Sequence, residues 1–105
     1  MAGRRFDLAL YVTLYHYTDE GKRTIDSAVE MSKLWRHQAS LHGAKVHALY
    51  WLEGRYDAVT IVEAPDEDLV TAMLLAIASE GSLHTETLSA YSTDDMARIL
   101  GKLAE

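Results

Sequence analysis

The stretch AKVHALYWLEGRYDAVTIVEA, residues 44–64, decides the fold of this chain. Two runs within it, 44–53 and 56–64, are rich in the β-branched and aromatic residues that are typical of strands. Gly54 and Arg55 separate the two runs, and a Gly-X pair favours a two-residue type II′ turn. The stretch therefore predicts a central antiparallel hairpin.

A strand and a helix precede this hairpin. Residues 6–16 alternate with a period of two, which predicts a strand. Thr18 is a candidate N-cap, but Gly21 weakens the turn that follows it. Apolar residues at helical spacing then predict a continuous helix over 27–42, and Gly43 stands where a left-handed residue would end it.

A second helix and a fourth strand follow the hairpin. A proline ends the hairpin's second strand, and Asp66 behind it is a candidate N-cap for a helix that we expect to reach about Glu80. Residues 82–91 alternate again and predict a strand. Ser92 and Asp95 have the spacing of a capping box, so they predict a short terminal helix.

The resulting order is β-α-β-β-α-β with a short C-terminal helix, which is the order of the ferredoxin-like fold in the α+β class. In this fold both main helices cover one face of an antiparallel four-stranded sheet. We expect a single domain over residues 1–105, with no helix on the other face of the sheet.

The alternation also assigns side chains to the two faces. We expect Leu8, Leu10, Val12 and Leu14 to pack against the helices, which leaves Tyr11 and Tyr15 on the open face. From the hairpin we assign His47, Leu49, Trp51 and Glu53 to the open face as well. Such an aromatic patch exceeds what monomers usually expose. It predicts a homodimer whose two sheets pack face to face as a dimeric α/β barrel, with a pocket between them.

The composition excludes several classes of function. The chain has 105 residues, 10 Lys+Arg against 16 Asp+Glu and no Cys. The net charge of −6 argues against a nucleic-acid partner, and the absence of Cys excludes thiol chemistry. No apolar run is long enough to span a membrane, and residues 1–14 lack the features of a signal peptide, so we expect a cytoplasmic protein. Phosphate loops, dinucleotide motifs and nucleophile elbows are absent.

The five histidines have no metal-ligand spacing, so no metal site is predicted. His47, His84 and Glu86 are the catalytic candidates, because residues two apart on a strand share a face and can present an imidazole with a carboxylate. The alternative is that these side chains are exposed or bonded to neighbours. Asp57 is expected to accept hydrogen bonds from turn amides, and Glu63 to hold the start of the second helix.

Tyr11, Tyr15 and Trp51 are the candidate walls of a ligand pocket, because aromatic side chains stack on planar molecules. The alternative is that the three rings form the core of a dimer interface.

Four separated blocks resemble the GYD domain family. They are Tyr17–Gly21 (YTDEG), Gly54–Val59 (GRYDAV), Val62–Asp66 (VEAPD) and Thr85–Leu88 (TETL), within a similarity that covers about residues 8 to 92. The resemblance implies a ferredoxin-like protomer of the dimeric α/β-barrel group, whose relatives include small monooxygenases, haem-degrading enzymes, decarboxylases and ligand-sensing modules. It assigns no catalytic residue to this chain.

Together these observations predict a homodimeric protein that binds a small apolar or aromatic molecule between its sheets. The protein would act on that molecule, if at all, without a cofactor, as a monooxygenase, cyclase or isomerase. The first alternative is a non-catalytic assembly or ligand-sensing regulatory module. A weaker alternative is haem binding through one histidine.

Overall fold

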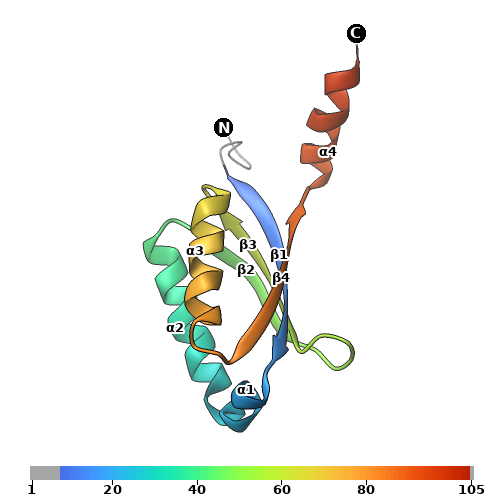
Figure 1. Cartoon of the computed structure of the whole chain (residues 1–105). Helices are drawn as coiled ribbons and strands as arrows, with labels where there is room; N and C mark the ends of the chain where they lie inside the picture. Colours follow the sequence, from blue (N-terminus) through green and yellow to red (C-terminus); the bar gives the residue numbers. More distant parts are fainter. Residues whose placement is uncertain (1–7, 105) are drawn as a thin grey trace.

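A computed structural model describes residues 8–104 and shows the predicted order of elements, with helices on one side of a single sheet (Figure 1). Phe6 and Asp7, at the start of the predicted first strand, lie outside the described residues. The elements are β1 Ala9–Tyr17, α1 Asp19–Arg23, the 3-10 turn η1 Ile25–Ser27, α2 Ala28–Leu41, β2 Lys45–Trp51, β3 Ala58–Ala64, α3 Glu67–Ala78, β4 Leu83–Ala90, α4 Thr93–Leu100 and the 3-10 turn η2 Gly101–Leu103.

The sheet has four strands in the order β2-β3-β1-β4, and every neighbouring pair is antiparallel. Helix α2 packs against β2, and α3 packs against β3 and β4, so both main helices cover the same face (Figure 1). This arrangement confirms the ferredoxin-like α+β prediction. Within one chain the sheet remains open, and in the described chain no helix covers its second face.

The predicted capping residues stand at the ends of the helices: side chains cap two N-termini, and a glycine follows one C-terminus. The Leu69 amide donates to Asp66 Oδ1 at 2.8 Å and starts α3. Ser92 and Asp95 form a reciprocal capping box at the start of α4. Gly43, with φ 87°, adopts the left-handed conformation just after α2.

The connection of the hairpin differs from the prediction. The loop runs over residues 52–57, because the two strands end at Trp51 and begin again at Ala58. Asp57 explains the longer loop. Its amide donates to the Tyr15 carbonyl at 2.8 Å, and its Oδ2 accepts from the Tyr17 amide at 2.8 Å. Asp57 therefore fastens the loop to β1 instead of accepting from turn amides as predicted.

The predicted assignment of the two faces of β1 is wrong. Tyr11, Thr13 and Tyr15 are only 7%, 2% and 5% exposed and lie under the helices, whereas Leu10, Val12 and Leu14 are half-buried on the open face. The core beneath the helices contains small side chains, Ala39, Ala44 and Ala64 among them. Tyrosine rings fill the space that these small residues leave. Aliphatic side chains therefore form the open face.

The C-terminal helix α4 extends beyond the end of the sheet and leans away from α2 and α3 (Figure 1). Asp95, in its first turn, is 2% exposed. Met96 and Leu100 of this helix are 41% and 58% exposed and Leu103 of η2 is 84% exposed, so these two elements present apolar side chains to solvent.

Candidate functional site

A cavity of about 750 Å³ lies between the helices and the sheet. Its walls come from α1, α2 and α3 on one side and from all four strands on the other. Leu34, which lines it, is 58% exposed, so the cavity opens to solvent. The volume lies in the range of small-molecule sites.

On β1 the cavity lining and the core lie at different ends of the strand, whereas on the helices the lining reaches from Ala28 to His42 and from Leu69 to Ile77. The end of β1 at Tyr15 and Tyr17 lines the cavity, whereas Tyr11 nearer its start belongs to the core. Small side chains in the lining leave this volume unfilled. The cavity-lining residues of this kind are Gly21, Ala28, Ala58, Ala72 and Ala76.

Aromatic residues with partnered polar atoms form part of the wall. Tyr15 OH lies 2.9 Å from Thr60 Oγ1 in a buried hydrogen bond, and Trp51 Nε1 donates to Tyr17 OH at 2.8 Å. Burial raises the pKa of Tyr15, and the hydrogen bonds from Thr60 and Thr13 offset part of that rise. The Tyr15 phenol is therefore neutral at physiological pH and presents its ring to the cavity.

The segment that begins α1 closes one end of the cavity. Thr18 Oγ1 donates to the Gly81 carbonyl at 2.6 Å, and the Thr18 amide donates to the Ser82 carbonyl at 3.1 Å. These bonds bring Gly21 so close to the loop before β4 that a Cβ at this position would overlap the Ser82 carbonyl oxygen. Glycine is required here by the close approach of two backbones.

Two of the three predicted ligand-wall residues line this cavity. Tyr15 and Trp51 do so, and Tyr11 instead packs in the core. Assigning Leu49 and Trp51 to the open face was wrong, because both line the cavity beneath the helices. Trp35 of α2 also lines the cavity. Its sequence position predicts only an apolar residue on the buried side of a helix, so the sequence does not identify it as a cavity residue.

The three catalytic candidates lie outside the described cavity lining and on the open face. His84 and Glu86 share that face on β4, opposite His16 and Leu14 of β1, as their spacing predicts. His47 lies on β2, at the other edge of the sheet. The fold of one chain therefore separates His47 from the other two candidates.

Two of the three candidates, His47 and Glu86, have side-chain hydrogen-bond partners. His47 Nε2 lies 3.1 Å from Glu63 Oε1, a contact that joins β2 to β3. Tyr56 OH donates to Glu86 Oε1 at 3.1 Å, and its ring centroid lies 4.8 Å from that of His16. These contacts form two polar clusters at opposite ends of the open face.

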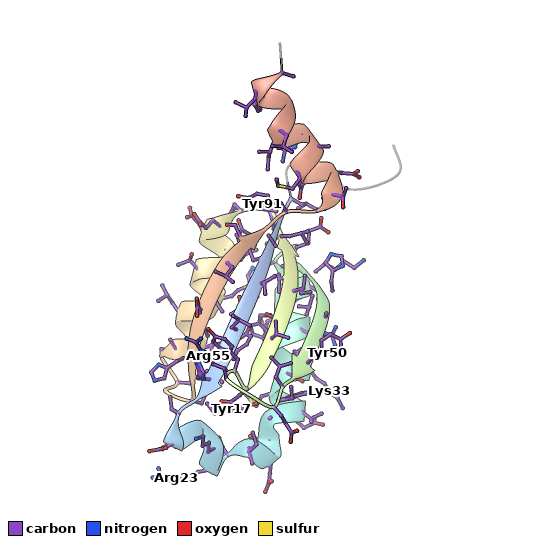
Figure 2. All side chains as sticks on the ribbon, turned by 90° about the vertical axis from the view of Figure 1, so that its right-hand side faces the viewer. Tyr17, Arg23, Lys33, Tyr50, Arg55 and Tyr91 are labelled. Atoms are coloured by element: carbon purple, nitrogen blue, oxygen red, sulfur yellow. The ribbon has the colours of Figure 1, made fainter. Side chains whose placement is uncertain are left out.

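Between the two polar clusters the open face is apolar. Val12 occupies its centre on β1, opposite Ile61 of β3 and Leu88 of β4. Leu88 is 46% exposed and Tyr50, on β2, is 62% exposed. Figure 2 views the molecule from the side of this face, with Tyr50 labelled.

Within residues 8–104, no group of three or more His, Asp or Glu side chains is placed to hold a metal ion. His42 is the one histidine among the described residues that line the cavity. Over the same residues, every helix is too short or too polar to cross a bilayer.

The fold and the cavity define an α+β domain of ferredoxin-like topology with a ligand-sized cavity between its helices and its sheet. The model of the GYD domain family matches residues 11–100. A protein from Thermus thermophilus, named glutamine synthetase and cystathionine beta-lyase binding protein, is 34% identical over 87 residues, which cover 82% of this chain and 92% of the relative. The chain belongs to the GYD domain family. No solved structure gives a significant match.

The blocks that carry the family resemblance have structural roles at the cavity. The block Gly54–Val59 contains Asp57, which fastens the hairpin loop to β1 beside the cavity-lining Tyr17. The block Tyr17–Gly21 closes the end of the cavity against Ser82. These two blocks thus support the shape of this region.

Proposed function

We propose that this protein is a homodimeric binding protein whose helix–sheet cavity holds a small apolar or aromatic molecule. The observation that carries the proposal is the cavity of about 750 Å³ with Tyr15, Trp35 and Trp51 in its wall. A concave site with aromatic walls and few polar groups is the usual form of a small-molecule site. The proposed activity is binding, because His47, His84 and Glu86 lie on the other face of the sheet.

The open face supports the dimer in this proposal. Its apolar centre around Val12, Ile61 and Leu88 would be covered by the same face of a second copy under two-fold symmetry. Helix α4 leans toward the side of the open face, so its exposed Leu100 would add contact area to a partner seated there (Figure 1). The ligand site lies within each protomer, on the opposite side of its sheet from this interface.

A titration with diphenylmethane tests the ligand site. This neutral probe has two aromatic rings and no hydrogen-bonding group, so it measures apolar binding alone. We expect saturable binding with one site per protomer by calorimetry, and a shift of tryptophan emission to shorter wavelength as the probe displaces water, because both tryptophans of the chain line the cavity. The absence of saturable binding would overturn the proposal of an apolar ligand site.

A second candidate function is binding to another protein. The relative's name describes binding to glutamine synthetase and cystathionine beta-lyase, and the helix layer of this chain exposes apolar side chains. Val29, Leu41 and Leu75 are 52%, 64% and 65% exposed on α2 and α3. Sedimentation of the purified chain with each of these two enzymes tests this function, with co-migration expected for the wild type and lost in Leu41→Glu.

A further inference from the structure

One end of the cavity brings two glutamates together. Thr18 Oγ1 donates to the Gly81 carbonyl at 2.6 Å, and this bond holds the start of α1 beside the loop before β4. Glu20 and Glu80 both line the cavity, and each lies within two residues of this bonded pair along the chain. The two carboxylates therefore belong to the same end of the cavity.

The aromatic pair of the wall lies at this end as well. Tyr17 directly precedes Thr18, and Trp51 Nε1 donates to Tyr17 OH at 2.8 Å. Both aromatic residues line the cavity, and Trp51 is 44% exposed, so part of its indole is accessible to a ligand. Asp57 adds a third carboxylate, because its Oδ2 accepts from the Tyr17 amide at 2.8 Å. This end of the cavity is thus both aromatic and acidic.

The two lining glutamates are accessible to a ligand. The Glu20 side chain is 63% exposed, and Glu80 is exposed as well. Arg23 Nη1 lies 3.4 Å from Glu20 Oε1, but exposed ion pairs of this kind are weak, so a ligand can compete for this carboxylate. Lys22 and Arg23 of α1 are both outside the described lining.

The charges and the apolar surface of the lining are separated. Among the described lining residues there is no Lys or Arg, and His42, the one that can become cationic, follows the other end of α2. An anion that enters the cavity would lose hydration and meet like charges. Beyond the acidic end, α2 and α3 line the cavity with apolar side chains, among them Met31, Leu69, Ala72 and Met73.

We infer that the ligand is an organic cation, an apolar or aromatic body that carries one ammonium group. The ammonium group lies among Glu20, Glu80 and the Tyr17–Trp51 pair, and the apolar body lies between α2 and α3. Carboxylates attract an ammonium group by charge, and aromatic rings attract it through their π-electrons. This inference rests on the proposed function, since it names the class of ligand for the same cavity.

Two probes of one shape test the inference by calorimetry. Benzyltrimethylammonium carries a positively charged nitrogen, and neopentylbenzene has a neutral carbon atom in its place. We expect the affinity for the cation to fall about twofold to fivefold in each of Glu20→Gln and Glu80→Gln, and further in the double variant. The affinity for neopentylbenzene should stay at its wild-type value in all three variants, which also shows that the cavity is intact.

Glu30→Gln is the matched control. Glu30 lies 3.4 Å from Lys33 in an exposed pair three residues apart, as Glu20 does with Arg23, but it is outside the described lining. This variant removes the same charge from the chain and should bind both probes as the wild type does. An equal loss of cation affinity in Glu30→Gln, or an unchanged cation affinity in the variant that combines Glu20→Gln with Glu80→Gln, would overturn the inference.

Nuclear Overhauser contacts give the orientation of the bound cation. The N-methyl protons should contact Tyr17 and Trp51, and the phenyl protons should contact Met73, which lines the apolar part of the cavity. The reverse orientation would overturn the inference. If neither probe binds, the proposed ligand site itself fails. If neopentylbenzene binds and benzyltrimethylammonium does not, only the assigned ligand class fails.

Discussion

The hydroxyl of Tyr15 lies 2.9 Å from the hydroxyl of Thr60, on the side of the sheet that faces α2 and α3. This bond lets a tyrosine ring occupy the space beneath the helices, because its polar end has a partner there. Tyr15 therefore forms cavity wall instead of dimer interface. The aliphatic side chains that alternate with it form the open face.

Burial of Tyr15 predicts a loss of stability in alkali. Its pKa is raised in the folded protein, whereas in the unfolded chain it lies near the ordinary value of about 10. Above that value the unfolded chain loses this proton first, so the free energy of unfolding should fall as pH rises toward the folded-state pKa. The pKa of Tyr11 is also raised, mainly by burial. Urea unfolding between about pH 8 and 11 measures the slope.

Tyr15→Phe is the control for this pH dependence. Burial raises the pKa of both Tyr11 and Tyr15, and this variant keeps only the Tyr11 phenol. Its free energy of unfolding should therefore fall less steeply above about pH 10 than that of the wild type. Equal slopes in the two proteins would show that Tyr15 has the same pKa folded and unfolded.

Gly21→Ala should destabilise the fold. The added Cβ would overlap the Ser82 carbonyl oxygen, so the end of the cavity must shift at a cost of about 1–3 kcal/mol. Gly101→Ala is the matched control, because its Cβ would meet nothing within 4 Å and its φ of −61° suits alanine. That control should gain roughly 0.4–1 kcal/mol in the free energy of unfolding. Similar effects at the two glycines would contradict the close packing of α1 on the loop before β4.

Filling the cavity should block the ligand. Ala72 of α3 lines the cavity, and Ala72→Phe places a ring in it. We expect the affinity for diphenylmethane to fall by about an order of magnitude, because one probe ring loses its apolar contact. Ala78→Phe, at an exposed position of the same helix outside the described lining, should leave the affinity unchanged. Calorimetry of both variants decides between a cavity site and a site elsewhere.

A charge at the centre of the open face should separate the proposed dimer. Val12→Glu places a carboxylate between Ile61 and Leu88, where two copies would bring two such charges together without a cationic partner. We expect sedimentation to show a dimer for the wild type and a monomer for this variant. Leu75→Glu, at a 65% exposed position on α3, is the matched control and should stay dimeric. A monomeric wild type at micromolar concentration would contradict the proposed interface.

The elements of the fold could be predicted because their boundaries depend on local chemistry. Asp66 and the Ser92–Asp95 pair cap helices through hydrogen bonds three residues apart, and Gly43 ends α2 by its own conformation. Such contacts leave a signature in a few neighbouring residues.

The faces of the sheet and the hairpin loop depend on distant residues. Alternation divides β1 into two sets of side chains, but both sets are apolar, and the small residues Ala39 and Ala64 on other elements decide which set lies under the helices. Asp57 likewise binds the backbone of β1 forty positions earlier in the chain.

The cavity could not be predicted for the same reason. It arises where small residues from three elements, such as Ala28, Ala58 and Ala72, face one another across the helix–sheet space. From the sequence, Trp35 could be predicted only as an apolar residue of a helix. Its place in the cavity wall becomes visible only when the surrounding side chains are placed.

Photolabelling with benzophenone tests the central claim most directly, because irradiation attaches this probe to C–H bonds that it touches, methionine side chains among them. Met31 and Met73 line the cavity, whereas Met96 lies on α4, outside the described lining, and is 41% exposed. We predict that mass spectrometry will find the label on Met31 or Met73, and that excess diphenylmethane will prevent it. Label on Met96 or on Val12 and its neighbours of the open face, with Met31 and Met73 unmodified, would contradict a ligand site between the helices and the sheet.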